Sequence, residues 1–349
     1  MREMKDSGIE WAGVIPNTWN INKGKYFMEL LTRPTLETDE VITCFRDGEV
    51  TLRSKRREEG FTVSLTEAGY QGIEIGDLVV HGMDGFAGSI GISDSRGKAT
   101  PVLNVLDTEQ NKRYMMYLMR TMAYCELFLS LATGIRVRTC DTNWKKLREI
   151  DYILPTIPEQ KAIADFLDEQ CAEIDSLISD IQSQIEALEE YKRSVITEAV
   201  TKGLDPDVEM RDSGVQWIGM MPTHWDCQRG KYLLRYVQKP VRDDDGVITC
   251  FRDGEVTLRS NRREEGFTMA DKEIGYQGID VGDLVVHGMD GFAGSIGISD
   301  SKGKASPVLN VLDTEQNKRY IMYYLRSMAY NDVFVALATG IRVRSCDLR

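Results

Sequence analysis

Residues 41–54 read VITCFRDGEVTLRS, and the same letters return at residues 247–260, an offset of 206 positions. Two further stretches repeat with this offset: GDLVVHGMDGFAGSIGISDS at residues 76–95 and 282–301, and ATGIRVR at residues 132–138 and 338–344. Between residues 41 and 141 about four positions in five match their partners, and no gap is needed. Because this period is too long for a solenoid repeat, it predicts a duplicated domain whose copies share a fold and a type of ligand.

Each copy mixes strand and helix signals. In the first copy, aliphatic and β-branched residues at 77–81 and 89–92 predict two strands around a glycine-rich bend. Turn dipeptides punctuate the strands at Asp47-Gly48, Asp84-Gly85 and Arg96-Gly97. Residues 114–131 predict a helix whose apolar stripe is Tyr117, Met122, Leu127 and Leu131. We therefore expect an α+β protein with two similar mixed α/β domains.

The segment between the copies follows another pattern. Residues 158–202 contain no glycine, and no proline after Pro158. Apolar residues recur every seven positions in a heptad seam, Leu167, Ile174, Ile181, Leu188 and Val195, with a second row at Cys171, Ile178, Ile185 and Ala199. Pro158 and Glu159 suit the first turn of a helix, and Gly203 suits its end. At ~1.5 Å per residue this helix spans roughly 65 Å, and its apolar seam needs a partner helix.

The composition indicates a folded protein. The chain has 349 residues, 42% of them hydrophobic and 28% charged. Its length predicts two domains, or two and a connector. No stretch approaches the ~18 apolar residues of a membrane span, and no apolar signal region follows Arg2 and Lys5, so we expect neither a membrane-spanning nor a secreted protein. Seven scattered cysteines without CxxC spacing favour reduced thiols in a cytoplasm over disulfides or a zinc site.

The formal net charge of −12 is unevenly distributed. Residues 156–206 hold twelve acidic and four basic side chains, whereas the rest of the chain holds 43 acidic and 39 basic ones. The remainder is thus near balance, with room for basic patches that bind nucleic acid. The alternative is that the net charge mainly serves solubility.

Motifs typical of enzymes are missing. The segment 91–100, GISDSRGKAT, resembles a phosphate loop, but five residues separate its glycines and Ala99 replaces the hydroxyl that would bind magnesium. We expect it to be a loop between strands. His81 and His287 correspond to each other and His224 has no counterpart, so neither copy offers a second histidine for a metal cluster. We expect no catalytic residue, no metal and no cofactor.

Basic residues, by contrast, recur in both copies. Lysine and arginine bind phosphate through charge, and arginine also pairs with guanine in the major groove. The candidate DNA-binding residues are Arg53, Lys55, Arg56, Arg57, His81, Arg96, Lys98, Arg136, Arg138, Arg259, Arg262, Arg263, His287, Lys302, Lys304, Arg342 and Arg344. A solvated charged surface remains the alternative for the basic clusters, and a hydrogen bond within the fold remains the alternative for the two histidines.

Several segments match a known pattern. The pattern lies mainly in three segments: LREIDYILPTIPEQKAIADFLDEQ at residues 147–170, LEEYKRSVITEAVTKG at 188–203 and LDPDVEMRDSGVQWIGMMP at 204–222. It also includes the opening GVIP at 13–16, Trp19 and the GDLVV segment. Its most recognisable parts are IPEQ at 157–160 and EYKRSVI at 190–196. With these segments the chain resembles the DNA-sequence-specificity subunit of type I restriction–modification systems along essentially its whole length.

The resemblance implies two target recognition domains, each reading one half of a bipartite double-stranded DNA site. It implies that long helices fix their spacing and dock the modification (methyltransferase) subunits. Methylation would belong to those subunits, and translocation and cleavage to a restriction subunit, in a prokaryotic cytoplasm. We expect recognition domains at 1–155 and 204–349 and the central helix at 156–203.

Two departures from the family matter. The family supplies a second helix after the second recognition domain, and here the sequence ends at Arg349, so we expect a fragment or a helix supplied by another chain, such as a second copy. The two domains are nearly identical, which predicts two similar, inverted half-sites. The alternative is a truncated scaffold or decoy that binds modification subunits without productive targeting.

Overall fold

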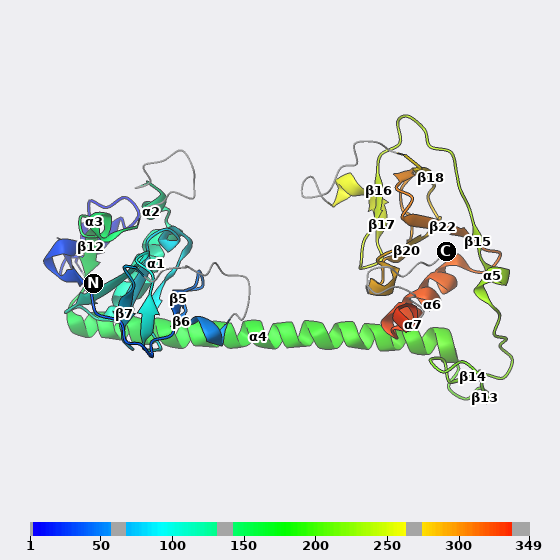
Figure 1. The fold of residues 1–349 in the computed structure, drawn as a ribbon, viewed down its shortest axis with the longest axis horizontal. Coiled ribbons are helices and arrows are strands. Elements are labelled where there is room, and N and C mark those ends of the chain that lie inside the picture. Colours follow the sequence, from blue (N-terminus) through cyan, green and yellow to red (C-terminus); the bar gives the residue numbers. More distant parts are fainter. Residues whose placement is uncertain (1–2, 57–67, 131–141, 263–273, 337–349) are drawn as a thin grey trace. The chain divides into compact units, whose positions relative to one another are not determined.

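The computed structural model describes residues 3–56, 68–130, 142–262 and 274–336, and it divides into two compact units, residues 1–178 and 179–349 (Figure 1). The division falls within one long helix, α4. Both units combine short antiparallel strands with helices, so the expected α+β class is confirmed. The expected domain boundaries stay a prediction.

The strands of unit 1 are β1 (Met4–Asp6), β2 (Val14–Pro16), β3 (Asn20–Lys23), β4 (Met28–Leu30), β5 (Ile42–Cys44), β6 (Val50–Leu52), β7 (Gln71–Ile73), β8 (Leu78–His81), β9 (Ile90–Ile92), β10 (Gly97–Ala99), β11 (Leu103–Thr108) and β12 (Asp151–Leu154). Its helices are α1 (Lys112–Tyr124), α2 (Leu127–Ser130), α3 (Trp144–Leu147) and the start of α4 (Ile157–Lys202), with 3-10 turns η1 (Gly24–Tyr26), η2 (Arg53–Lys55) and η3 (Gly85–Ala87).

The strands of unit 2 are β13 (Met210–Asp212), β14 (Met220–Pro222), β15 (Arg235–Tyr236), β16 (Ile248–Cys250), β17 (Val256–Leu258), β18 (Gln277–Ile279), β19 (Leu284–His287), β20 (Ile296–Ile298), β21 (Gly303–Ala305) and β22 (Leu309–Asp313). Its helices are α5 (Gly230–Leu233), α6 (Lys318–Tyr330) and α7 (Val333–Ala336), with turns η5 (Arg259–Asn261) and η6 (Gly291–Ala293). From β16 to α7 these elements repeat β5 to α2 in the same order, which confirms the shared fold predicted from the repeat.

A four-stranded antiparallel sheet forms the centre of each unit, in the order β4-β11-β8-β9 and β15-β22-β19-β20. Leu78 and Val80 of β8 join a buried cluster with Met119 of α1, whereas Val79 joins a second cluster with Ile42 of β5. The strand is therefore covered on both faces, which explains why its sequence is a continuous apolar run and does not alternate. The predicted strands at 77–81 and 89–92 are confirmed as β8 and β9.

The helix expected at 114–131 is shorter than predicted. The Asn111 side chain accepts a hydrogen bond from the N–H of Tyr114 and caps α1, which ends at Tyr124. Glu126 then adopts a left-handed conformation with φ of 58°, and α2 begins at the next residue. The single long helix was therefore a wrong prediction. Of its expected stripe, Met122 is fully buried, Tyr117 and Leu127 are half-buried, and Leu131 lies outside the described residues.

The segment 91–100 also differs from its prediction. Gly97 begins strand β10, which pairs with β7, so this segment is not one continuous loop, and Arg96-Gly97 is not a turn. The bend lies at Asp94 and Ser95. The Asp94 carboxylate accepts hydrogen bonds from the hydroxyls of Thr51 and Ser95. These bonds stabilise the bend, so the bend does not depend on Gly97. Turns at Asp47-Gly48 and Asp84-Gly85 agree with the prediction.

Helix α4 is continuous from Ile157 to Lys202, as its glycine-free sequence predicted. At its start, Glu159 accepts hydrogen bonds from the Thr156 N–H and hydroxyl, at 3.3 and 3.0 Å, which satisfies groups that a helix end leaves unpaired. At its end, Gly203 has a φ of +82° and donates to Ala199 O at 3.2 Å. Glycine is the residue best suited to this left-handed position after a helix.

Both ends of α4 are attached to folded structure. In unit 1, the buried Gln160 accepts from Asn111 N at 3.0 Å and donates to Pro155 O at 2.9 Å, and Arg113 pairs with Asp165 and Asp168. In unit 2, Tyr320 donates its hydroxyl to Val200 O at 3.0 Å, and Arg193 lies over the Tyr330 ring at 5.5 Å. These contacts fix the first turns of α4 to unit 1 and the last turns to unit 2.

A close approach of two backbone segments favours glycine at Gly91 of unit 1 and at its counterpart Gly297 of unit 2. A Cβ on Gly91 of β9 would lie 1.9 Å from Gly48 O, whereas a Cβ on Gly230 meets nothing within 4 Å. We expect Gly91→Ala to lower the free energy of unfolding by about 1–3 kcal/mol, the usual cost of overpacking. Gly230→Ala is the control and should not destabilise. Urea denaturation monitored by tryptophan fluorescence measures both, and an unchanged midpoint for Gly91→Ala would contradict this packing.

Candidate nucleic-acid interface

The carboxyl end of β8 carries a cluster of polar and exposed side chains, Arg46, His81, Met83 and Asp84, here called the β8 cluster. His81 is the last residue of the buried strand, so its position is fixed by the core. Its Nδ1 accepts hydrogen bonds from the backbone N–H groups of Met83, at 3.2 Å, and Asp84, at 3.0 Å. Because Nδ1 is an acceptor, the neutral ring carries its proton on Nε2.

Arg46 and Asp84 form an ion pair in this cluster, with 3.0 Å between Nη2 and Oδ1. The Arg46 side chain is 67% exposed. An exposed pair of this kind contributes little to stability, so the guanidinium is available to exchange Asp84 for a phosphate. Met83, which precedes Asp84 in the chain, is 55% exposed and offers an apolar surface of the kind that contacts thymine methyl groups.

Unit 2 repeats this arrangement in the β19 cluster, Arg252, His287, Met289 and Asp290. The His287 Nδ1 accepts from the N–H groups of Met289 and Asp290, at 3.3 and 2.9 Å. Arg252 pairs with Asp290 at 3.3 Å. Burial lowers the pKa of both His81 and His287 below the ordinary value, although Asp84 and Asp290 act in the opposite direction. Both imidazoles are therefore neutral at neutral pH, and each can act as a hydrogen-bond donor through Nε2.

The candidate residues that follow β6 are mostly engaged with their own unit. Arg53 donates its Nε to Thr43 Oγ1 at 3.1 Å, and Lys55 contacts Asp94 at 3.1 Å and Ser95 at 2.8 Å. In unit 2, Arg259 repeats the contact of Arg53, with 3.2 Å to Thr249 Oγ1.

Arg56 is held by two carboxylates and an aromatic ring. It lies 2.7 Å from Asp47 and 2.9 Å from Glu49, and its guanidinium is 4.3 Å from the Phe45 ring centre. Partial burial would raise the pKa of Asp47, but hydrogen bonds from the Glu49 N–H and from Arg56 lower it. Arg262 makes the same contacts with Asp253, Glu255 and Phe251 in unit 2. These two arginines are fixed in place with their charge compensated.

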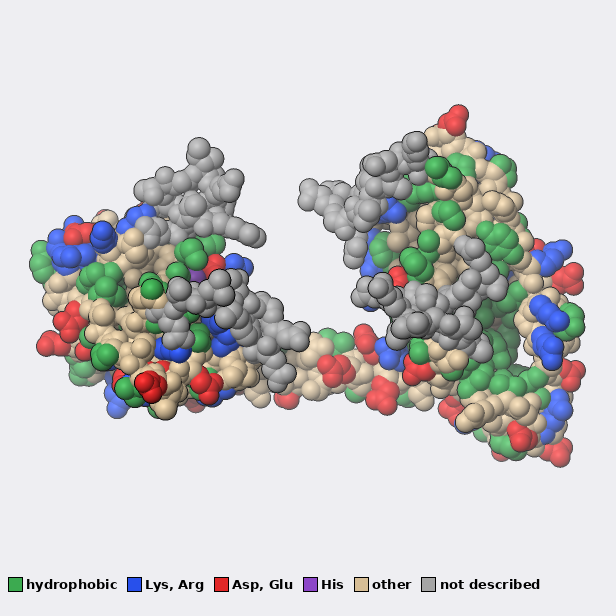
Figure 2. Space-filling model, in the orientation of Figure 1, with side chains coloured by type: hydrophobic (Ala, Val, Ile, Leu, Met, Phe, Trp, Pro, Cys, Tyr) green, Lys and Arg blue, Asp and Glu red, His purple; other side chains and the backbone are tan. Residues whose placement is uncertain are grey.

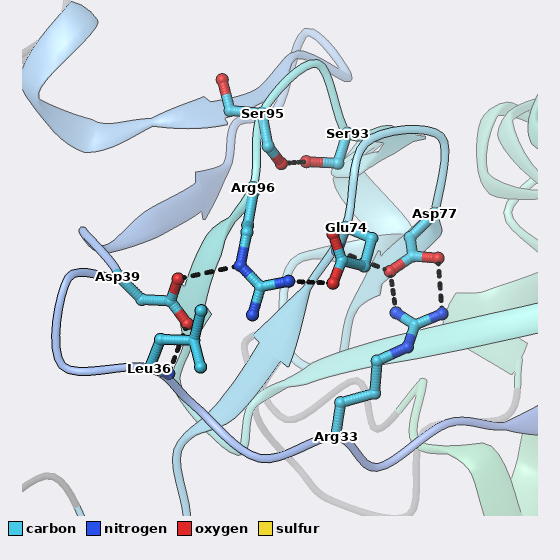
Figure 3. A network of polar contacts seen from close by, with 8 residues as sticks. All are labelled: Arg33, Leu36, Asp39, Glu74, Asp77, Ser93, Ser95 and Arg96. Atoms are coloured by element: carbon cyan, nitrogen blue, oxygen red, sulfur yellow. Dashed lines mark hydrogen bonds and ion pairs between the residues drawn. The ribbon is translucent and has the colours of Figure 1, made fainter.

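Figure 3 shows that Arg96 bridges two carboxylates of unit 1. It donates to Asp39 at 3.1 Å and also pairs with Glu74. Beside it Arg33 pairs with the buried Asp77, which also accepts the N–H of Glu74 at 2.8 Å. Arg96 therefore ties three segments of unit 1 together, a structural role that the sequence analysis did not anticipate.

The other candidates fall into two groups. Lys98 lies half-buried in β10, as does Lys304 in β21, and Lys302 is exposed. Arg57, Arg136, Arg138, Arg263, Arg342 and Arg344 lie outside the described residues. The structure brings His81 and His287 into the two clusters, whereas Arg53, Lys55, Arg56 and Arg96 bond to residues outside them.

Sequence reasoning missed Arg46, Met83 and their partners Arg252 and Met289. The signal that could have found them is the repetition of the letters FRDGE and HGMDG in both copies, next to strand ends. A lone arginine followed by an aspartate gives no sign of a basic cluster. Only the fold brings it to a histidine 35 positions away.

The heptad seam lies on the surface in the middle of α4. Six of its residues, Ile174, Ile178, Ile181, Ile185, Leu188 and Val195, are each between 45% and 65% exposed. Leu167 is half-buried near the packed start of the helix. Figure 2 shows acidic side chains along the same stretch. This exposed apolar row is the part of the helix that a partner would cover.

Other kinds of site find no support in the described parts of the chain. Within residues 3–56, 68–130, 142–262 and 274–336, no group of three His, Cys, Asp or Glu side chains is arranged to hold a metal ion. None of the helices there has the length and apolarity to cross a membrane.

Comparisons with known proteins bear on this arrangement. No family model matches the sequence. A putative type I restriction enzyme MjaX specificity subunit from Methanocaldococcus jannaschii is 30% identical over 129 residues, which are 36% of this chain and 28% of that protein. The chain resembles type I specificity subunits. The resemblance seen in the sequence is thereby confirmed, over little more than a quarter of that relative's length.

A solved structure from a type I R-M system has a similar fold. A chain from a structure described as "complex assembly and conformational transition of the type I R-M system" has a TM-score of 0.52 at 9% identity, covering 90% of this chain and 81% of that chain. The HsdS subunit from Thermoanaerobacter tengcongensis has a TM-score of 0.49 at 10% identity, over 95% of this chain and 84% of that one. At 9% identity, the likeness to the chain from the type I R-M system concerns the fold alone.

The two half-buried histidines, His81 and His287, should make stability depend on pH. In the unfolded chain they bind protons near their ordinary pKa of about 6.5, whereas the folded chain binds them only at lower pH. Stability should therefore fall as pH drops below about 6.5. Replacing both with asparagine, whose Oδ1 can accept the same N–H groups, should reduce the loss of melting temperature between about pH 7.5 and 5.5. His224→Asn, at an exposed position, is the control, and an equal loss in all three proteins would contradict the assignment.

Proposed function

We propose that this chain is the DNA-sequence-specificity subunit of a type I restriction–modification complex. Its two units would each read one half of a bipartite site in double-stranded DNA, and α4 would fix the spacing of the half-sites and dock the modification subunits. The observation that carries the proposal is the duplicated unit with matching polar clusters at the ends of β8 and β19, in a chain that resembles specificity subunits. Because the matched relative is itself called a specificity subunit, the decoy alternative is not favoured.

The pairing of the two clusters supports near-palindromic recognition. Arg46, His81 and Asp84 have the same hydrogen bonds as Arg252, His287 and Asp290. Two sites with the same donors at the same positions recognise the same base edges. If a two-fold axis relates the units on DNA, the half-sites are inverted copies.

Sequence differences between the two copies would make the two units differ in their affinity for their half-sites. Lys55 corresponds to Asn261, whose amide donates to Thr257 Oγ1 at 2.8 Å and which carries no charge. Arg96 corresponds to Lys302, so the bidentate guanidinium is replaced by a point charge. Because Lys55 and Arg96 bond to carboxylates of their own unit, we expect these differences to change how firmly each unit holds its loops, and so its affinity for a half-site, without changing the sequence read.

The chain itself would perform no chemistry. In this proposal the modification subunits methylate the DNA, and a restriction subunit translocates and cleaves it. The chain supplies binding energy, orientation and spacing. Two recognition domains held at a fixed separation require a fixed number of base pairs between the half-sites, because the twist of DNA makes the direction of the groove depend on that number.

Selection from a random duplex library tests the proposed recognition. With modification subunits present, we expect enrichment of two inverted, near-identical half-sites at one fixed spacing. His287→Ala should relax the sequence preference of one half-site and leave the other unchanged, because each Nε2 donor would serve a single half-site. His224→Ala is the control. Two unrelated half-sites, or no enrichment from an assembled complex, would refute the proposed recognition.

The Arg46 and Arg252 side chains are expected to bind phosphate. Each change to alanine should weaken binding by a similar factor for specific and random duplexes, and should reduce the slope of log K against log salt by about 0.9 for each lost contact. Lys161→Ala, an exposed residue of α4, changes the net charge equally and should leave the slope unchanged. Fluorescence anisotropy at several salt concentrations measures this. A slope unchanged in Arg46→Ala and Arg252→Ala would place the phosphate contacts elsewhere.

The exposed heptad seam is expected to bind a helical protein partner. Burying a leucine or isoleucine contributes about 1.5–3 kcal/mol, so Ile181→Asp with Leu188→Asp should weaken modification-subunit binding by at least tenfold. The matched control is Gln182→Asp with Ser183→Asp, which adds the same two negative charges at neighbouring exposed positions outside the seam. Surface plasmon resonance measures the affinities, and circular dichroism checks that both variants stay helical. Equal binding by both variants would exclude the seam as the docking surface.

A further inference from the structure

An exposed tyrosine borders the β8 cluster. Tyr124 is the last residue of α1, and its side chain is 65% exposed. The nearby Gly88 has a φ of +91°, and a Cβ on it would lie 3.0 Å from Arg46 O and 3.6 Å from both the Tyr124 hydroxyl oxygen and the ring atom Cε1. The end of α1 is therefore next to the loop that carries Arg46, and the ring lies at the surface beside it.

One turn earlier on α1, Arg120 is held by neutral acceptors. Its Nη2 donates to Asp47 O at 2.7 Å and to the Tyr124 hydroxyl at 3.1 Å. The carboxylate of Asp47 pairs instead with Arg56, at 2.7 Å. Among the described residues, no carboxylate forms an ion pair with Arg120. Its positive charge is thus left without a direct counter-charge beside the β8 cluster.

Unit 2 repeats this arrangement at the end of α6. The Arg326 Nε donates to the Tyr330 hydroxyl at 3.0 Å, and Nη2 donates to Asp253 O. The Asp253 carboxylate pairs with Arg262 at 2.7 Å. Arg326 is only 9% exposed, and none of the described carboxylates forms an ion pair with it. Burying a charged group costs free energy unless it is paired, so an arginine kept in this position in both copies indicates a place for an anion.

Each tyrosine supplies a second donor at the same point. The Tyr124 hydroxyl oxygen accepts from Arg120, so its own proton is available to another acceptor, and none of the described residues accepts it. The Tyr330 hydroxyl is in the same situation beside Arg326. A guanidinium and a hydroxyl donor side by side match the charge and the acceptor oxygens of a phosphate group.

The two tyrosines differ in what covers the ring. The guanidinium of Arg193 of α4 lies 5.5 Å from the centre of the Tyr330 ring, and this side chain is half-buried. Tyr124, by contrast, bonds to Arg120 alone among the described residues. The Tyr124 hydroxyl can therefore be removed without disturbing packing, and unit 1 is the place where binding and stability can be separated.

We propose that Arg120 with Tyr124, and Arg326 with Tyr330, form a phosphate-binding pair beside each cluster, which holds a backbone phosphate of the DNA that the unit reads. The guanidinium supplies the charge, and the hydroxyl supplies a second hydrogen bond. Because phosphate contacts position a protein on the duplex and base contacts specify the sequence, the pair would set the position of the neighbouring cluster without reading a base. This inference rests on the proposed function.

Removing the Tyr124 hydroxyl tests the pair. The chain, assembled with modification subunits, is titrated with labelled duplexes and followed by fluorescence anisotropy. Tyr124→Phe should weaken binding about tenfold, the usual effect of one lost hydrogen bond to a charged group, and by a similar factor for specific and random duplexes. The melting temperature should not change, because the side chain is exposed. Tyr26→Phe is the matched control, since Tyr26 is a tyrosine of unit 1 that is 74% exposed.

The charge of Arg120 is tested separately. Arg120→Gln should reduce the slope of log K against log salt by about 0.9, the value for one phosphate contact on duplex DNA. Arg120→Lys keeps the charge and should keep the slope, although a lysine cannot reproduce the geometry of the guanidinium. If Arg120→Gln lowers the melting temperature, Tyr124→Phe decides the question, because it leaves the arginine in place.

Failure of the phosphate pair is distinguishable from failure of the proposed function. Enrichment of half-sites from the library, with unchanged affinity in Tyr124→Phe and an unchanged slope in Arg120→Gln, would overturn the pair alone. Weaker binding of the specific duplex only would also overturn it, since Tyr124 would then contact a base edge. Absence of enrichment, with the tenfold loss retained on random duplexes, would refute sequence-specific recognition and support the pair.

A free phosphate is the other source of the same chemistry. Ligands that bind only the folded chain raise its melting temperature, so about 10 mM inorganic phosphate should have the same small effect on the wild type and on Arg120→Gln. A rise confined to the wild type, together with unchanged DNA affinity in Arg120→Gln, would identify a free phosphate as the ligand and overturn the assignment to DNA.

Discussion

Burial of β8 on both faces is the constraint on which the rest of each unit depends. Leu78 and Val80 are covered by α1, and Val79 by the small strands on the opposite face. A strand packed from both sides cannot shift along its axis without exposing one of these clusters, and each buried side chain of this size contributes about 1.5–3 kcal/mol. The end of β8 is consequently a rigid point. His81 occupies it, and the loop that carries Met83 and Asp84 is fastened to its ring by two hydrogen bonds.

The repeat and the long helix could be predicted because each depends on information within a short stretch of sequence. Helix α4 has a continuous heptad pattern, a first-turn glutamate and a glycine at its end, and it begins and ends within a residue of the prediction. The break at Glu126 could not be predicted, because a left-handed residue leaves the apolar periodicity on both sides intact. Strand β10 was missed for a related reason, since a three-residue strand is too short to show alternation.

Much of the candidate site could not be predicted, because its charges are paired across long distances in sequence. Arg96 appeared to be one of two basic residues in an exposed turn, yet it bonds to Asp39 and Glu74, which are 57 and 22 positions away. Arg46 was not among the candidate residues, yet the fold places it beside Asp84 at the end of β8. Counting basic residues along the chain therefore overestimates how many DNA contacts clusters such as Arg53 to Arg56 could make. It also overlooks single residues that the sheet brings together.

The charges of α4 and of the two units favour a division of surfaces between partners. The helix segment 156–206 has twelve acidic and four basic side chains, and its apolar row is exposed in the middle. An acidic surface repels the phosphate backbone, and an apolar row gains most from contact with another protein. The rest of the chain is close to electrical balance, with 43 acidic and 39 basic side chains. Its exposed Arg46 and Arg252 are each held by an ion pair that a phosphate can replace. In the proposed function, the acidic excess on the helix would keep DNA at the recognition domains and leave the helix for protein contacts, so that neither partner would compete for the surface of the other.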